Sequence, residues 1–199
     1  MGSHDTYQRI VASARELMYA SSYADAGVAT ICEKAEVKKG SFYHFFKSKQ
    51  ELTLAVIDSY YAGFKDELVT NAFARDVPPL ARIERLFISI VDLQIQMHKQ
   101  TGQIYGCPFG NLATELSTQD EVIRSKIDQV FHRISMLLQQ TLQEAVDQGA
   151  LDNIDTAVTG TAMLAYFEGM LLLAKTSNDP AILQQLTPAL MNIRIPAHS

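Results

Sequence analysis

The chain has 199 residues, of which 47% are hydrophobic and 20% are charged, and its formal net charge is −5. This length and composition are typical of a folded protein with a buried core, and they exclude a disordered chain, a disulfide-rich mini-protein and a coiled-coil rod. Two cysteines cannot form a disulfide framework and no N-terminal signal segment is visible, so we expect a cytoplasmic protein. The longest nearly uninterrupted apolar stretch, 163–174, is too short to span a bilayer, so we expect no membrane partner.

The charge is unevenly distributed along the chain. Residues 1–50 carry 7 Lys and Arg against 5 Asp and Glu, whereas residues 51–199 carry 10 against 17. A basic segment on an acidic remainder is expected where only that segment meets DNA phosphates. A solvated charged face explains the same asymmetry, so charge alone leaves both interpretations open.

Hydrophobic residues spaced by three and four predict helices along almost the whole chain, and no segment alternates as a β-strand does. Asp5 is expected to cap the first helix, and short helices are predicted at 28–35 and 40–46. Ser48 and Glu51 have the spacing of a capping box, which predicts the start of a longer helix.

The second part of the chain continues the helical pattern. Pro79 suits the first turn of a helix that runs to Gly102. Thr118 and Glu121 have the spacing of a second capping box, before a helix that ends at Gly149. Further helices are predicted at 109–116, 153–175 and 180–193. The pattern therefore predicts an all-α fold with about nine helices.

The most informative segment is 28–52, where two helices too short to be stable alone are joined by a tight turn. This is the geometry of a helix-turn-helix, whose second helix can enter the major groove of DNA. Phe42, Phe45 and Phe46 lie on one side of that helix, at the spacing that buries them. Gly40, on the other side, lets the backbone approach a duplex closely. A plain helical hairpin with a solvated polar face has the same spacing.

Several side chains of this segment suit a DNA contact. Lysines suit phosphate oxygens, a tyrosine hydroxyl can donate to a phosphate, and serine or histidine can reach base edges. The residues that we expect to contact DNA are Thr30, Lys38, Lys39, Gly40, Ser41, Tyr43, His44, Lys47 and Lys49.

A stretch at 35–52 resembles the DNA-binding signature of the TetR family of transcriptional regulators, and it reads Ala-Glu-Val-Lys-Lys-Gly-Ser-Phe-Tyr-His-Phe-Phe-Lys-Ser-Lys-Gln-Glu-Leu. The resemblance implies an all-helical homodimer. In such a protein, residues 1–47 form the domain that binds double-stranded operator DNA, and residues 48–199 form the ligand-binding and dimerisation domain. Gly27 stands where many members have Ser or Thr, and glycine is an acceptable N-cap.

A second constellation lies at 106–117, where Cys107 stands in a Gly/Pro loop just before a predicted helix. A thiol at a helix N-terminus is near the positive end of the helix dipole, which favours the reactive thiolate and a pKa below that of a free thiol. The alternative is that Cys107 is a small buried hydrophobic residue. Cys32 stands among core positions, and we expect it to be inert.

The second half also resembles the branch of the TetR family that includes the N-ethylmaleimide-reductase repressor. The shared features are the Gly106-Cys107 loop, the following Glu115 and the ending Leu-Ala-Lys-Thr-Ser at 173–177. This resemblance implies a sensor of electrophiles or oxidants, with Cys107 as the sensing thiol. Lys175 is then a candidate to stabilise the thiolate, or it caps the carbonyls at the end of its own helix.

The other candidates are weaker. Glu168 is a charge in an apolar helix, where it faces a ligand cavity or pairs with Lys or Arg. Four aromatic residues either line a ligand pocket or belong to the core: Phe64, Phe87, Phe131 and Tyr166. His98, His132 and His198 share no metal-ligand spacing, and no phosphate-binding or catalytic motif is present, so we expect no metal and no cofactor.

These patterns predict a DNA-binding transcriptional regulator and not an enzyme. Its best description is a repressor released from a palindromic operator by a small molecule or by modification of Cys107. A reversible sensor of an apolar ligand, without thiol chemistry, is the first alternative. A helical adaptor for protein partners is another, and so is an enzyme with Cys107 as nucleophile, which would need a base such as His98 or His132.

Overall fold

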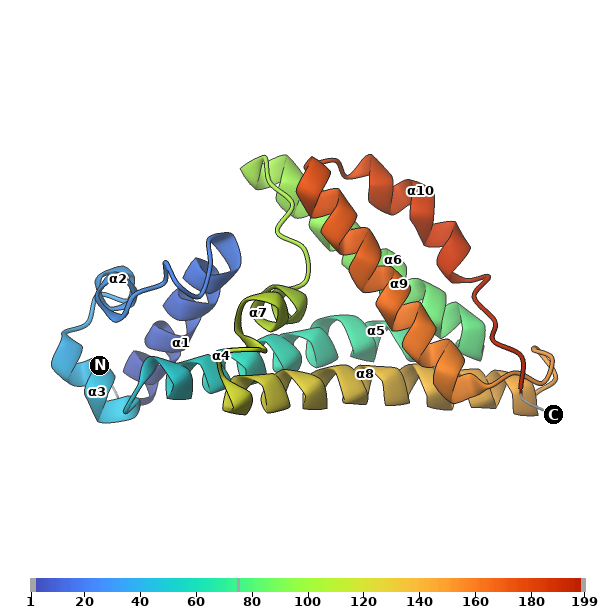
Figure 1. Cartoon of the computed structure of the whole chain (residues 1–199), viewed down its shortest axis with the longest axis horizontal. Helices are drawn as coiled ribbons and strands as arrows, with labels where there is room; N and C mark the ends of the chain where they lie inside the picture. The colour runs from blue at the N-terminus through green and yellow to red at the C-terminus, as the bar shows by residue number, and fades with distance from the viewer. Residues whose placement is uncertain (1–2, 75, 198–199) are drawn as a thin grey trace. The chain divides into compact units, whose positions relative to one another are not determined.

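The computed structural model of the chain describes residues 3–74 and 76–197. Within these residues nine α-helices of seven or more residues make up most of the fold, and the extended pairing is limited to one isolated bridge between Ile154 and Pro196. The prediction of an all-α fold with about nine helices is confirmed (Figure 1). The helices pack into two compact units. These units reflect packing, and the functional boundary expected between residues 47 and 48 stays a prediction.

The first unit contains the chain up to Gly63 together with 108–129. Because its short helices are marginal alone, burial of apolar side chains from several helices stabilises them. The helices are α1 (Ser3–Ala20), α2 (Val28–Lys34), α3 (Lys39–Phe45), α4 (Lys49–Gly63), α7 (Pro108–Leu116) and the first turns of α8 (Glu121–Asp147). The fully buried side chains at its centre include Ile10, Ile31, Phe42, Leu52, Ile57 and Ile123.

The second unit contains 64–107 and the chain from Val130 onward. Besides the remainder of α8, its helices are the π-helix η1 (Phe64–Val69), α5 (Thr70–Ala72), α6 (Pro79–Thr101), α9 (Thr156–Ser177) and α10 (Ala181–Leu190). Phe87 of α6 packs against Phe167 of α9, with ring centroids 4.6 Å apart. Gly160 lets α9 cross α8 closely, because a Cβ there would lie 3.1 Å from the backbone nitrogen of Gln139.

The N-termini of the helices confirm one predicted cap and correct two others. Ser48 accepts a hydrogen bond at its Oγ from the backbone N–H of Glu51 at 3.1 Å, as the capping box predicts. The box at Thr118 and Glu121 is wrong, because Asp120 caps α8 and accepts from two backbone N–H groups at 3.0 Å each. Aspartate directly before the first helical residue is an equally good cap. Asp5 lies inside the first turn of α1, which already begins at Ser3.

The start of α9 is also later than the sequence indicates. The prediction placed it at 153, whereas α9 begins at Thr156, and Asp155 is its N-cap. The carboxylate of Asp155 accepts from the backbone N–H of Val158 at 2.9 Å. Asn153 instead belongs to the connection that precedes this cap.

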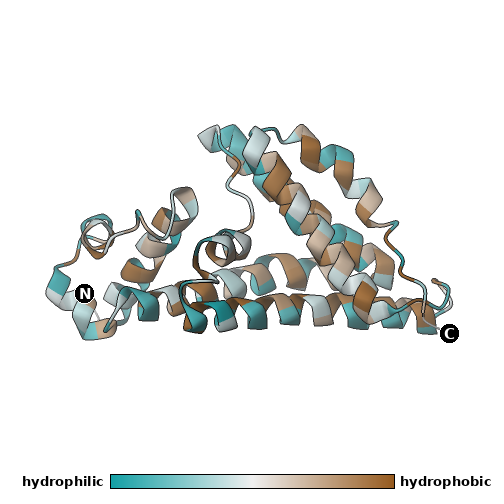
Figure 2. Cartoon of the chain, viewed as in Figure 1, coloured by the Kyte–Doolittle hydropathy of each residue, from teal (hydrophilic) through white to brown (hydrophobic). Residues whose placement is uncertain are grey.

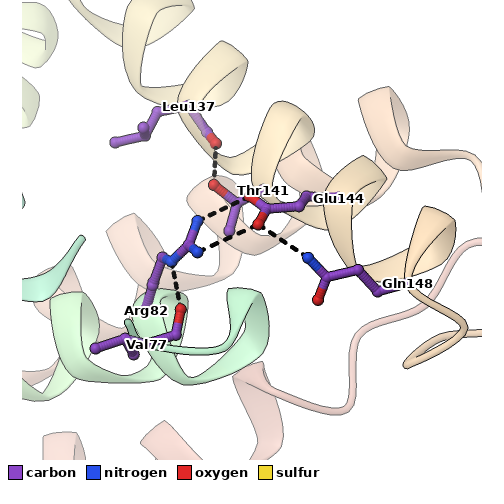
Figure 3. A network of polar contacts seen from close by, with 6 residues as sticks. All are labelled: Val77, Arg82, Leu137, Thr141, Glu144 and Gln148. Atoms are coloured by element: carbon purple, nitrogen blue, oxygen red, sulfur yellow. Dashed lines mark hydrogen bonds and ion pairs between the residues drawn. The ribbon is translucent and has the colours of Figure 1, made fainter. Parts of the chain in front are cut away.

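A polar network fixes the beginning of α6 to the last turns of α8 (Figure 3). The guanidinium of Arg82 donates to both carboxylate oxygens of Glu144, at 2.8 and 3.2 Å, and to the carbonyl of Val77 at 2.6 Å. Gln148 donates to the same carboxylate at 3.1 Å. A paired guanidinium with three acceptors holds the connection before α6 more firmly than a single ion pair does.

The helix α9 is the most apolar long helix of the chain (Figure 2). With 22 residues it is long and apolar enough, by length and composition, to cross a membrane, and it extends well beyond the apolar stretch 163–174. The core helix of a soluble protein passes the same test. Met163, Phe167 and Leu171 of α9 are buried in the second unit.

Candidate nucleic-acid interface and thiol site

The turn between α2 and α3 is held from outside the helix-turn-helix. Glu36, in this turn, has a φ of 54°, in the left-handed region that non-glycine residues rarely adopt. Arg9 of α1 donates to the carbonyl of Ala35 at 2.7 and 3.1 Å and to the carbonyl of Glu36 at 2.9 Å. Sequence reasoning missed Arg9 because nothing in its local pattern shows a partner so far along the chain. This guanidinium fixes the angle at which α3 leaves α2.

The two faces of α3 differ as the sequence predicts. Phe42 and Phe46 are buried, and Phe45 is half-buried beside Tyr7 of α1, with ring centroids 5.9 Å apart. On the opposite side Tyr43 is 57% exposed. The other predicted DNA-contacting residues that are exposed are Thr30, Lys38, Lys39, Gly40, His44 and Lys47, and Ser41 is half-buried.

Gly40 has no intrachain reason to be glycine. A Cβ built at this position meets no atom within 4 Å. The absence of a side chain therefore leaves the backbone of α3 free for a close approach to another molecule, which agrees with the DNA contact predicted for this residue.

Lys49 is placed differently from the other lysines of the segment. Its ammonium donates to the carbonyl of Tyr23 and lies 3.9 Å from the centroid of the Tyr23 ring. Burial lowers the pKa of Lys49, and the charges of nearby Glu115 and Asp25 oppose that change. In this conformation the ammonium stabilises the first unit through its contacts with Tyr23, and its contact with a DNA phosphate stays a prediction.

Cys107 directly precedes Pro108, the first residue of α7, as predicted for a thiol at a helix N-terminus. The loop before it is held by the side chain of Gln94 on α6, which is 3% exposed. Gln94 donates to the carbonyl of Gly106 at 3.1 Å and accepts from the N–H of Gly106 at 3.2 Å. The loop that carries the thiol is therefore fixed to α6 by a buried amide.

The structure brings Cys107 together with Glu168, two residues that the sequence nominated separately. The Cys107 thiol hydrogen-bonds the Glu168 carboxyl, and the ligand-facing and ion-pairing roles expected for Glu168 stay predictions. Burial raises the pKa of Glu168, and the hydrogen bond from Cys107 opposes that rise. Lys175 is exposed in the last turn of α9, and its contact with the thiol stays a prediction.

The second cysteine is confirmed as a core residue. Cys32 on α2 is 4% exposed. Burial raises the pKa of the Cys32 thiol, and the charge of Lys39 opposes that change. Since the thiolate is the reactive form, Cys32 is protected both by its burial and by its protonation.

The aromatic candidates have structural partners. Phe87 is buried against Phe167, and the hydroxyl of Tyr166 donates to the carbonyl of Leu186 on α10 at 3.1 Å. Phe131 and Phe64 are half-buried, the latter as the first residue of η1. The part of the chain that the structure describes holds no group of three or more His, Cys, Asp or Glu residues suited to a metal ion, and His198 lies outside that part.

Comparisons with known proteins agree with this architecture. Residues 10–56 match the model of the bacterial regulatory proteins of the tetR family, and residues 79–190 match that of the tetracyclin repressor-like C-terminal domain. The chain is 31% identical over 180 residues to the HTH-type transcriptional regulator in the lacX 3′ region of Lactococcus lactis, covering 90% of this chain and 88% of that protein.

Two further similarities extend over most of the chain. It is 27% identical to the HTH-type transcriptional repressor NemR of Escherichia coli over 148 residues, which are 74% of this chain and 72% of that protein. A crystal structure of the regulatory protein TetR from Rhodobacter sphaeroides superposes with a TM-score of 0.82 at 26% identity, covering 96% of this chain and 99% of that one.

The chain belongs to the TetR family of DNA-binding transcriptional regulators. Its members are regulators and not enzymes, so Cys107 is not a catalytic nucleophile.

Proposed function

We propose that this protein is a cytoplasmic repressor that binds a palindromic operator as a homodimer, with α3 of each protomer in the major groove. The observation that carries the proposal is the exposed polar face of α3, opposite its buried phenylalanines. Tyr43 on that face and Lys47 just after the helix contact phosphates, and Ser41 and His44 reach base edges. The similarity to NemR, a repressor, supports repression over activation.

The outer side of α9 supports the homodimer. Leu172 and Leu173 are 59% and 55% exposed, and Val158 is 46% exposed. Large apolar side chains that gather on one helix face mark an interaction surface. We therefore place α9 and α10 of two protomers in a four-helix interface around a two-fold axis, which matches the symmetry of a palindromic operator.

Modification of Cys107 is the proposed signal for release. When the thiol adds to an activated alkene, a carbon–sulfur bond forms and the thiol proton is accepted by the carboxylate of Glu168. That proton, or one from water, is then added to the other carbon of the former double bond, which completes the adduct. Because burial raises the pKa of Glu168, this carboxylate is a stronger base than an exposed glutamate.

The adduct adds bulk to a loop that has little room to move. Gln94 fixes the preceding Gly106, and Pro108 begins α7 directly after the thiol. The resulting strain shifts the helices that carry the DNA-binding residues, including α4, and separates the two copies of α3. Release follows because the adduct has different free energies in the two arrangements.

The experiment compares the parent protein with Cys107→Ser and, as a matched control, Cys32→Ser. A DNA duplex is first selected by the untreated protein from a random-sequence library. Each protein is exposed to N-ethylmaleimide, its adducts are located by mass spectrometry, and its affinity for the selected duplex is measured. We expect Cys107 to react before Cys32 and expect Cys107→Ser to bind DNA normally but to stay bound after exposure.

Cys32→Ser should release the duplex as the parent does. Release of Cys107→Ser at the same N-ethylmaleimide concentration would contradict the thiol signal, and a reversible apolar ligand would then be the better account of induction.

A further inference from the structure

The loop between α1 and α2 takes two of its hydrogen bonds from a carboxylate on α7. One oxygen of Glu115 accepts from the backbone N–H of Tyr23 at 2.9 Å, and the other accepts from the N–H of Ala24 at 2.8 Å. Hydrogen bonds from an N–H to an ionised carboxylate are stronger than those between neutral groups. One side chain of α7 thus binds two consecutive amides of the loop that leads into the helix-turn-helix.

The loop has no equivalent arrangement of its own for these two amides. Within it, Ser22 accepts from the N–H of Asp25 at 3.0 Å through its hydroxyl, and the carbonyl of Ser22 accepts from the N–H of Ala26 at 3.2 Å. The backbone N–H groups of Tyr23 and Ala24 donate instead to the carboxylate of Glu115. Loss of the carboxylate would remove two charge-assisted hydrogen bonds from consecutive amides, so the loop conformation and the position of α7 depend on each other.

Further contacts place the same corner of the molecule against α4. Lys49, the first residue of α4, binds the carbonyl and the ring of Tyr23. Gln50 donates to the carboxylate of Asp120, the N-cap of α8, at 2.7 Å. Burial and then the charges of Asp120 and Glu115 raise the pKa of Tyr23, which agrees with two carboxylates close to one ring.

We propose that Glu115 is a positioning residue for operator binding, whose carboxylate makes the conformation of the α1–α2 loop, and hence the presentation of α3, depend on the position of α7. Glu115 lies on α7, outside the helix-turn-helix. It acts through Tyr23 and Ala24, which precede α2 by a few residues.

The same contact gives the thiol a direct route to the DNA-binding helices. Cys107 is joined by a peptide bond to the first residue of α7, and Glu115 lies two turns further along this nine-residue helix. A short helix moves as a rigid body, so displacement of the loop at Cys107 moves the carboxylate. This second step rests on the proposed release by thiol modification, whereas the holding role of Glu115 does not.

The first arm of the test uses untreated protein. Glu115→Gln keeps one acceptor and loses the other, and Glu115→Ala loses both. Glu121→Gln is the matched control, because Glu121 is an exposed glutamate whose carboxylate pairs with Arg124 on its own helix. We expect faster amide hydrogen exchange at residues 20–27 and about tenfold weaker binding of the selected duplex in both Glu115 variants, with an unchanged salt slope. The Glu121 variant should match the parent.

Unchanged exchange and affinity in Glu115→Ala would overturn the holding role. A uniform loss of protection across α1 to α4 would also overturn it, because Glu115 would then stabilise the unit as a whole and not this loop.

The second arm measures the affinity ratio between untreated and N-ethylmaleimide-treated protein, for the parent and for Glu115→Gln. If α7 carries the signal, the ratio falls by about fivefold or more in the variant. Equal ratios would overturn the route through α7. They would not bear on the holding role of Glu115, which the first arm tests. A parent protein that shows no release at all would instead refute the thiol signal, and that result is distinct from either failure of Glu115.

Discussion

The exposed face of α3 and the pair formed by Cys107 and Glu168 are built in different ways. The face of α3 comes from consecutive residues, so helical periodicity decides which side chains are buried and which are exposed. The thiol site comes from a loop and from the middle of α9, and its two side chains meet through tertiary packing. The comparison teaches that the composition of a local face can be read from the sequence, whereas the composition of an assembled site depends on how each helix around it packs.

The largest expected effect concerns dimerisation, which brings the exposed faces of two α3 helices together for operator binding. Leu172→Glu places a charge on the exposed apolar side of α9, and we expect loss of the dimer at micromolar concentration because an unpaired charge is costly to bury. Operator affinity should fall with it, although α3 is unchanged. Sedimentation measures the oligomer, and a Leu172→Glu protein that remains fully dimeric would remove α9 from the interface.

The next effect tests the body that supports the assembled site. Gly160→Ala puts a Cβ 3.1 Å from a backbone nitrogen of α8, and we expect the overpacking to lower the free energy of unfolding by about 1–3 kcal/mol. Gly169→Ala, on the same helix, meets no atom within 4 Å and should be neutral or stabilising by about 0.5 kcal/mol.

Both glycine variants are made in the Leu172→Glu background, so that dimerisation does not contribute, and are unfolded with urea. We expect a lower free energy of unfolding for Gly160→Ala than for Gly169→Ala. Equal values would show that α8 and α9 accommodate the added methyl group of Gly160→Ala without loss of stability.

A change confined to the local face should have a smaller and more specific effect. Lys47→Ala should weaken operator binding about equally for all sequences and reduce the salt slope by about one, because we propose that its exposed ammonium meets a phosphate. Lys65→Ala, an exposed lysine of η1, should leave the slope unchanged. Filter binding or fluorescence anisotropy over a series of salt concentrations measures both, and an unaltered slope in Lys47→Ala would place this lysine outside the interface.

The smallest effect is a pH dependence of the assembled site. Burial raises the folded-state pKa of Glu168 above its unfolded value, so above that unfolded value the folded protein binds more protons than the unfolded chain. Its contribution to stability therefore falls as the pH rises from the unfolded pKa of about 4.3 through the folded value. Glu168→Gln should remove this decline, and Glu84→Gln, at an exposed position of α6, should retain it.

Urea unfolding of the three proteins at about pH 4 and about pH 7 measures the difference. An identical pH dependence in the parent and in Glu168→Gln would mean that the carboxyl of Glu168 titrates alike in the folded and unfolded chains.

Much of the fold was predictable because its signals are local. Pro79 at a first turn, Gly102 in the left-handed conformation at a helix end, and the Ser48 cap each act within a few residues. The errors were also local: Asp120 and Asp155 competed with neighbouring polar residues as N-caps, and several candidate caps in one short segment cannot be ranked without their hydrogen bonds.

The sequence by itself determined the helical architecture, the buried and exposed sides of α3 and the resemblance to DNA-binding regulators. These follow from periodicity and from a continuous motif. Only the tertiary structure decided that Arg9 holds the turn before α3, that Glu168 is a contact of Cys107, and that Glu115 binds the loop between α1 and α2. The physical reason is that a hydrogen-bond partner far along the chain is chosen by how helices pack, and packing depends on the shapes of all the buried side chains together.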